Sequence, residues 1–354
     1  MTKRLLLCLL AACMVLCVGC KRQEFSELAE EAVVITPTEI DPPEIFYPNP
    51  LTGIKELKED AQNKRPVAVM INNISVAQEV QCGLNDADVV FECLVEGGIS
   101  RLMAVYYDVE PVKQIGSIRS ARYTYAELCK WLDAVYVHHG SDTRYAVPYM
   151  KEIELDHYEV NNTSGFRAEN GLSWEHRLYT DGEKLTKALK DGKFRLTNEE
   201  PTKPIFTFGD AASPVTPATP CDSVTFAMSP SNKTTFTYDP QTQKYVRSPS
   251  GKVHKDYRTK EDTVTDNVII LYANSPHFED NYHVKTKLTS GKGLYVSKGG
   301  SQTIRWEKNG DSNDLVLMDE EGKPLTINPG SSWIAFPPTS GQPESKPETK
   351  TSVN

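Results

Sequence analysis

The sequence lacks the motifs by which metal and nucleotide sites are usually recognised. Beyond its first 20 residues it has no Cys-x-x-Cys pair, and it has no His-Glu-x-x-His motif, which argues against a zinc site. Its Gly-Gly and Gly-x-Gly groups are typical of turns and match neither a P-loop nor a dinucleotide fingerprint. We therefore expect no metal and no cofactor. The sequence also lacks the Gly-x-Ser-x-Gly elbow of many hydrolases.

Cysteines are few outside the first 20 residues. They are Cys82, Cys93, Cys129 and Cys221. Their spacing does not match a zinc ribbon or a thioredoxin-type site. One disulfide could form among them, and the sequence does not decide whether it does.

Basic residues are also too few for a nucleic-acid partner. The chain has 39 Lys and Arg against 48 Asp and Glu, which gives a formal net charge of −9. Because binding to a phosphate backbone needs a basic surface, we expect no nucleic acid. The apolar run near the start is shorter than the roughly 20 residues that span a bilayer comfortably.

Residues 1–20 have the pattern of an export signal. A basic start precedes the apolar run from Leu5 to Val18, and small residues then lead to Cys20. This ending resembles the bacterial lipoprotein signal, in which the cysteine receives acyl chains such as palmitate. We expect lipidation at Cys20, with Cys13 as the alternative, and anchoring at the outer face of the cell membrane. A plain secreted protein or a single anchor helix is the other reading.

Composition divides the rest of the chain into two folded regions. We expect an α/β domain with a mixed or mostly parallel sheet over residues 64–200 and a smaller antiparallel β-rich domain over 221–337. Residues 21–63 are acidic and proline-rich, and residues 338–354 are similar, so both favour disordered segments. Residues 201–220, rich in Pro, Thr and Ser, are the expected linker.

The hydrophobic pattern predicts alternating helices and strands in the first region. We expect strands there at 67–71, 102–108 and 134–138, and helices at 85–96, 121–131, 144–156 and 181–189. In the second region we expect hairpins at 236–247 and 293–306. The helix at 85–96 rests on apolar residues at i, i+3, i+4, i+7 and i+8. Strands that alternate with helices favour parallel pairing through right-handed crossovers.

Ligands bind beyond the carboxyl ends of the strands in open α/β sheets. The expected ligand-binding residues at those ends are Asn72, Asn73, Arg119, Arg122, His138 and Ser141. We expect Arg119 and Arg122 in the first turn of the helix at 121–131, where they could fork a carboxylate or phosphate. The same arrangement predicts that Glu96 and Arg101 pair with each other at the opposite edge of the sheet.

Two alternatives concern the same polar residues. The arginines could instead stabilise the fold by pairing with Glu92 or Asp88. No catalytic group can be assigned from the sequence, and the candidates are Glu92, His139 and His176. The loop that holds His176 also carries Trp174 and Glu175, and such loops commonly carry function.

Several segments together resemble the YerB-like lipoprotein family of Gram-positive bacteria, a two-part domain of unknown function. They are Arg65–Asn73, Gly83–Leu84, Ala87–Val90, Glu92, Val95–Arg101, Ile115–Arg122, His138–Ser141, Asp266–Ile269 and Gly291–Trp306. The sequence departs from the family pattern at Ser117, where a proline is usual, and at Glu175 before His176. The resemblance implies an exported lipoprotein with two domains, and it supplies no activity.

Three functions fit these observations. The first is a membrane-tethered binding protein that holds an anionic or polar ligand, such as a cell-wall component or the carboxylate of a protein partner, at Arg119 and Arg122. The second is a hydrolase of a cell-envelope polymer, with a histidine or glutamate as acid or base. The third is a structural adaptor whose motifs serve only folding.

Overall fold

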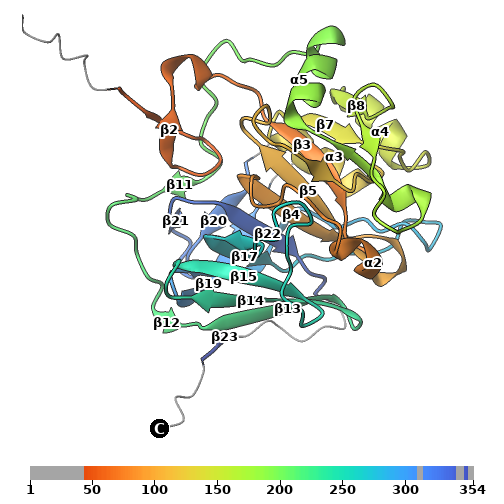
Figure 1. Ribbon diagram of the computed structural model, residues 1–354. Helices are drawn as coiled ribbons and strands as arrows, with labels where there is room; N and C mark the ends of the chain where they lie inside the picture. Colours follow the sequence, from red (N-terminus) through yellow and green to blue (C-terminus); the bar gives the residue numbers. More distant parts are fainter. Residues whose placement is uncertain (1–43, 309–313, 340–346, 350–354) are drawn as a thin grey trace, which may run out of the picture. The chain divides into compact units, whose positions relative to one another are not determined.

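A computed structural model describes residues 44–308, 314–339 and 347–349. The expected signal, Cys20 and the tether up to residue 43 lie outside these residues. The main element is an 11-stranded sheet (Figure 1). Its spatial order is β12 (Thr219–Pro220), β19 (Gly300–Glu307), β18 (Ser290–Ser297), β17 (Asn267–Leu271), β22 (Ser332–Phe336), β4 (Val89–Leu94), β5 (Ser100–Tyr106), β3 (Val67–Asn72), β7 (Val135–His138) and β8 (His157–Glu159), with β20 (Val316–Met318) beside β19.

This sheet is mixed, which is one of the two arrangements that the sequence predicts. β3 pairs in parallel with β7, and β7 pairs in parallel with β8. β5 is antiparallel to both of its neighbours, β3 and β4. The hairpin of β18 and β19 confirms the one predicted at 293–306.

Both halves of the sequence contribute strands to the same sheet. β4 comes from the first half and β22 from the second, and they pair in parallel with Phe91 opposite Ile334. β22 also pairs in parallel with β17, so the second half is not purely antiparallel. The two predicted regions therefore share one hydrogen-bonded layer.

The expected disordered segments and linker hold some ordered structure where the chain is described. Residues 44–63 include β1 (Tyr47–Pro48), β2 (Lys55–Leu57) and the 3-10 turn η1 (Glu59–Ala61). The linker region includes β11 (Thr207–Phe208), which pairs with β21 (Thr326–Ile327). The tail includes β23 (Pro347–Glu348), which pairs with β13 (Ser223–Ser229). β1 pairs with the nearby β2, whereas β11 and β23 pair with strands distant in the sequence, which the local composition does not reveal.

Two apolar cores lie on opposite faces of the large sheet. On β17, Val268 and Ile270 face one core while Ile269 and Leu271 face the other, as the two-residue period of a strand requires. α3 (Tyr123–Trp131) and α4 (Ala146–Glu152) cover one face. The other face is covered by α5 (Gly182–Asp191) and by a five-stranded sheet. That sheet contains β16 (Val264–Thr265), β15 (Lys244–Pro249), β14 (Asn232–Asp239), β13 and β23.

The predicted helix at 85–96 is wrong, because residues 89–94 form the central strand β4. Val89, Val90 and Phe91 are all buried, since β4 has a core on each of its faces. A strand buried on both sides has no polar alternation, so its apolar run also satisfies a helical spacing. Pairing with β22 and β5 decides the matter in favour of the strand.

This correction moves Glu96 and Arg101 to the other edge of the sheet. Because β4 and β5 form an antiparallel pair, the turn between them lies beside the carboxyl end of β3, with Asn72 opposite Arg101. The residues expected at opposite edges therefore lie at one edge. The turn itself is the 3-10 segment η2 (Glu96–Gly98).

The helices predicted near 121–131, 144–156 and 181–189 are confirmed as α3, α4 and α5. The expected position of the two arginines in the first turn of α3 is wrong. Arg122 is the residue before the helix, with extended backbone angles, and Arg119 lies further upstream.

The four cysteines of the folded region are buried free thiols: Cys82, Cys93, Cys129 and Cys221. Burial raises the pKa of the Cys93 and Cys129 thiols far above the usual value for cysteine. Such protonated, inaccessible thiols pack as small apolar groups and are poor nucleophiles.

Candidate functional site

Polar side chains gather at the edge of the sheet where β3 and β7 end. The segment that leads into α3 lies along this edge, because the Arg119 N–H donates to the Met70 carbonyl (3.0 Å) and the His139 N–H donates to the Arg119 carbonyl (3.1 Å). A bridge between Ala121 and Ser141 continues this pairing. The segments of residues 118–122 and 138–142 are thereby held side by side.

Three guanidinium groups meet at this edge, and we call Arg101, Arg119 and Arg122 the arginine cluster. Arg122 Nε lies 2.5 Å from Glu96 Oε1, so the predicted Glu96–Arg101 pair is wrong. Arg101 instead donates to the Ser120 carbonyl at 2.5 Å.

Mutual repulsion and burial act on the arginine cluster. Burial, together with the positive charges of Arg122 and Arg119, lowers the pKa of Arg101 to about 10, against the raising effect of Glu96. Burial and the charge of Arg122 also lower the pKa of Arg119, against the raising effect of Glu175. These arginines remain protonated at neutral pH, so an added anion would relieve the repulsion among them.

Arg119 has the most capacity for a ligand within this cluster. Its side chain is half-buried. Its guanidinium donates a long hydrogen bond, of 3.4 Å, to the Glu175 carbonyl. A guanidinium carries five N–H donors in a planar fork that matches a carboxylate or phosphate.

Asn73 and Glu92 lie in a separate buried network instead of the arginine cluster. Glu92 is on the face of β4 that packs against the five-stranded sheet, where it accepts from Ser100 Oγ (2.6 Å) and Trp333 Nε1 (3.1 Å). Asn73 Nδ2 donates to Glu92 Oε1 at 3.2 Å. Burial raises the pKa of Glu92, and the charge of Arg247 opposes that rise.

Arg247 is the charged residue of this network that the sequence did not single out. It is fully buried on β15, donates to Asn73 Oδ1 (2.9 Å) and Gln81 Oε1 (3.2 Å), and stacks over the Trp333 ring at 4.7 Å. Burial lowers the pKa of Arg247 to about 10, against the raising effect of Glu92. The alternating pattern of β15 is the signal that could have placed Arg247 inward. The network joins the two halves of the chain. Because Glu92 is fully buried within it, Glu92 is unavailable as a general acid or base.

The candidate histidines are engaged by neighbouring protein groups. The His138 ring contacts the Gly140 carbonyl (2.8 Å) and His157 Nδ1 (3.1 Å). The His139 ring contacts the Val160 carbonyl (2.8 Å) and Arg167 Nη2 (3.4 Å).

His176 is the third candidate, and it is buried. Its Nδ1 accepts from Asn72 Nδ2 at 2.8 Å, and its Nε2 lies 3.7 Å from Glu175 Oε1. Asn72 therefore positions His176 and does not present its amide to a ligand.

His138 should make the stability of the protein fall in mild acid. Burial lowers the pKa of His138 from 6.5 to about 4. Above pH 6.5 the ring is neutral in both states. Below that value the unfolded chain takes up a proton that folded His138 takes up only near pH 4, so stability is lost within this window.

We expect wild type to lose about 2 kcal/mol more than His138→Gln between pH 7 and pH 5. The free energy of unfolding from urea titrations at the two pH values measures this difference. His277→Gln, at an exposed histidine, is the control and should follow wild type. Equal acid sensitivity of wild type and His138→Gln would refute the role of His138.

A loop from the second half completes the charged edge. His283, between β17 and β18, lies 2.6 Å from Asp280, 3.4 Å from Asp142 and 3.9 Å from Glu96. Its contacts show that both halves of the chain build the edge that holds the arginine cluster.

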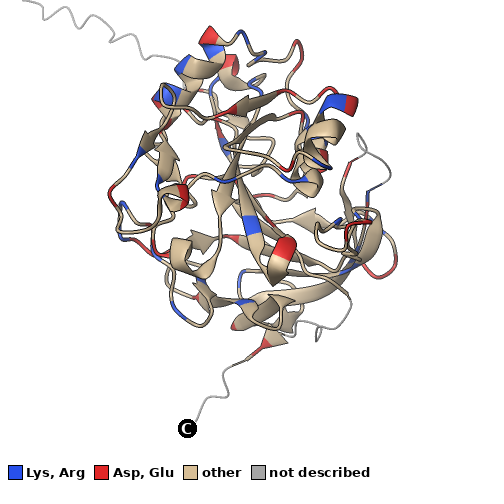
Figure 2. Cartoon of the chain, turned by 90° about the vertical axis from the view of Figure 1, so that its right-hand side faces the viewer, with Lys and Arg blue, Asp and Glu red and all other residues tan. Residues whose placement is uncertain are grey.

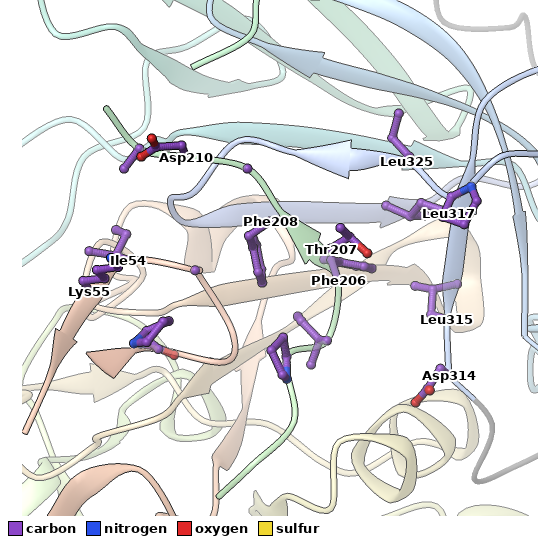
Figure 3. Close-up of a pocket in the computed structure, with 18 of the residues that line it drawn as sticks. Ile54, Lys55, Phe206, Thr207, Phe208, Asp210, Asp314, Leu315, Leu317 and Leu325 are labelled. Carbon is purple, nitrogen blue, oxygen red and sulfur yellow. The ribbon is translucent and has the colours of Figure 1, made fainter. Parts of the chain in front are cut away.

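A cavity with a different chemistry lies elsewhere. It has a volume of about 1110 Å³ and is bordered by apolar side chains from the segments around β11, β20 and β21 (Figure 3). They include Ile205, Phe206, Phe208, Leu315, Leu317 and Leu325. No member of the arginine cluster lines this cavity.

Charged residues of both signs are interspersed along the helices and loops (Figure 2). In the described part of the chain, no group of three His, Cys, Asp or Glu side chains could hold a metal ion. The described helices include none that is long and apolar enough to cross a membrane.

The fold and site define a two-part protein whose halves share one mixed sheet and one arginine-lined edge. Residues 51–195 match the model described as "Protein of unknown function (DUF3048) N-terminal domain", and residues 224–334 match its C-terminal counterpart. The chain belongs to this family, which confirms the resemblance to YerB-like proteins.

A curated relative and a solved structure support this assignment. The chain is 30% identical over 301 residues to the Bacillus subtilis (strain 168) protein named "Putative lipoprotein YerB", covering 82% of this chain and 86% of the relative. It is also similar to the crystal structure of YerB protein from Bacillus subtilis, with a TM-score of 0.70 and 26% identity. That match covers 82% of this chain and 96% of the solved one.

Proposed function

We propose that this protein is an extracytoplasmic lipoprotein, lipidated at Cys20, whose arginine cluster binds an anionic ligand associated with the cell envelope. The signal pattern ending at Cys20 and the lipoprotein name of the relative support the anchor. Anchoring through more than one acyl chain would be stable, whereas one chain binds a membrane only marginally.

The crowding of three guanidiniums carries the binding proposal. The charges of neighbouring arginines contribute to lowering the pKa of Arg101 and of Arg119, and the buried carboxylate among them, Glu96, is already paired with Arg122. Several close positive charges favour an anion, and Arg119 has donors to offer it.

A hydrolase is the second candidate, and the contacts favour it less. A general base must reach the proton that it removes. The ring nitrogens of His138 and His139 face protein groups, His176 is buried, and Glu92 is enclosed in the network with Arg247.

Arg119→Ala should abolish anion binding while leaving the fold intact. The test is a thermal-shift assay on residues 21–354 with inorganic phosphate and with a dicarboxylate. Saturation at a hundredfold excess over Kd adds about 2.7 kcal/mol, so we expect the Tm of wild type to rise by roughly 4 °C. The Tm of Arg119→Ala should not respond.

Arg305→Ala is the matched control, because Arg305 is an exposed arginine on β19, outside the cluster. This variant should respond to anions as wild type does. If neither anion raises the Tm of wild type, the binding proposal fails. If wild type does not respond to either anion and Arg119→Ala has a lower Tm than wild type, the results would instead support the structural adaptor.

A further inference from the structure

Trp174 is the exposed member of the four tryptophans in this sequence. Its side chain is 64% exposed, whereas Trp131, Trp306 and Trp333 are 9%, 1% and 2% exposed. A single exposed apolar side chain is common on protein surfaces and indicates little. The neighbours of Trp174 are what make it informative.

Arg167 holds the Trp174 indole in place. Its guanidinium lies 4.0 Å from the centre of the ring, and its Nη1 donates to the Trp174 carbonyl at 2.7 Å. His139 in turn holds Arg167. Because Nδ1 of His139 faces the Val160 carbonyl, Nδ1 must carry the ring proton. Its Nε2 can therefore accept a hydrogen bond from Arg167 Nη2 at 3.4 Å. A ring held in this way loses little entropy when a ligand stacks on it.

The same short turn links the indole to the arginine cluster. Trp174 begins the 3-10 segment η3 (Trp174–His176). Glu175 follows Trp174, and its backbone carbonyl accepts a hydrogen bond from Arg119 Nη1 at 3.4 Å. His176 comes next, and its ring accepts from Asn72 at the end of β3. The exposed aromatic ring is therefore carried by the residue directly before the one whose carbonyl Arg119 contacts.

We propose that the ligand of this edge is an acidic sugar, whose ring stacks on Trp174 while its acidic group binds Arg119. This inference rests on the anion site proposed above and names its ligand class. A pyranose ring has an apolar face of C–H groups that packs on an indole, and a carboxylate or phosphate fits the guanidinium fork. Carboxylated and phosphorylated sugars share this chemistry.

A nucleotide is the competing ligand, because its base could stack on Trp174 and its phosphate could bind Arg119. The sugar is favoured because the proposed location, at the outer face of the membrane, is where glycans of the envelope are exposed. AMP serves as the probe for this alternative.

Acrylamide quenching of tryptophan fluorescence tests the proposal directly, since Trp174 is the exposed tryptophan that a neutral quencher reaches first. The protein, residues 21–354, is titrated with N-acetylmuramic acid, glucose 6-phosphate, glucose, inorganic phosphate and AMP, and affinities are measured by calorimetry. Both acidic sugars should protect Trp174 from quenching and should bind about tenfold more tightly than phosphate, as one aromatic contact allows.

Variants separate the ring contact from the anion contact. Trp174→Ala should lose the preference for acidic sugars over phosphate, and Trp174→Phe should retain most of it. Arg119→Ala should abolish binding of both, and Arg305→Ala should behave as wild type.

Two failures are distinguishable. If phosphate binds through Arg119 and the acidic sugars bind no more tightly, the sugar inference fails while the anion site stands. If phosphate and the sugars all fail to bind wild type, the proposed function fails as well. Tighter binding of AMP than of either acidic sugar would overturn the inference in favour of a nucleotide, and preferential binding of one acidic sugar would identify the acid group.

Discussion

Replacing Arg247 with methionine should lower the free energy of unfolding by about 3–5 kcal/mol. Arg247 is fully buried, and its positive charge opposes the rise in the pKa of Glu92 that burial causes. Without that charge, Glu92 would be a buried carboxylate with only neutral hydrogen-bond donors beside it. Urea denaturation of wild type and Arg247→Met at pH 7 measures the loss.

The loss of unfolding free energy caused by Arg247→Met should become smaller as the pH falls toward 4.5, the usual pKa of a glutamate. A carboxyl whose pKa is raised by folding binds a proton more readily in the folded state, so lower pH stabilises that state relative to the unfolded chain. A loss that stayed constant over this range would show that lost packing against Trp333, and not the unpaired charge, dominates.

The double variant Glu92→Gln with Arg247→Met is the matched control for this network. It removes both charges, so it should be more stable at pH 7 than Arg247→Met alone. Arg305→Met, at an exposed position, should change stability by about 0.5 kcal/mol or less. If Arg247→Met costs no more than Arg305→Met, the buried network does not stabilise the two halves.

Cys20→Ala should remove lipidation completely. If Cys20 accepts the lipid, alanine leaves no thiol for acylation at the end of the signal. Cells that express the full chain with an alkyne analogue of palmitate should yield a labelled wild-type protein and an unlabelled Cys20→Ala protein. Cys13→Ala, within the same signal, is the control and should be labelled as wild type is. Labelling that persists in Cys20→Ala and disappears in Cys13→Ala would assign the lipid to Cys13 instead.

Local patterns in the sequence were sufficient for many elements of this fold. The strand at 67–71, the helix at 121–131 and the hairpin at 293–306 all match the structure. Each of them is specified by its own apolar period and the turn residues beside it, because these features act over a few residues. The family was also recognisable from short glycine and arginine motifs.

The candidate site was only partly predictable, because its geometry depends on the direction of the strands. Arg119 and Arg122 could be singled out, but the partner of Arg122 could not. Interpreting residues 85–96 as a helix reversed the direction of the chain there and placed Glu96 at the wrong edge. The strand β4 turns directly into β5, which carries Glu96 to Arg122.

The residues alone were enough to indicate a lipoprotein-type signal, two folded regions and a pair of arginines suited to an anion. The tertiary structure decided that the two regions share one sheet, that Asn73 links Glu92 to Arg247, and that Arg119 contacts the turn that begins at Trp174. These contacts join residues far apart in the chain. They depend on the pairing of β4 with β22 and on which face of each strand is buried, and no local propensity carries that information.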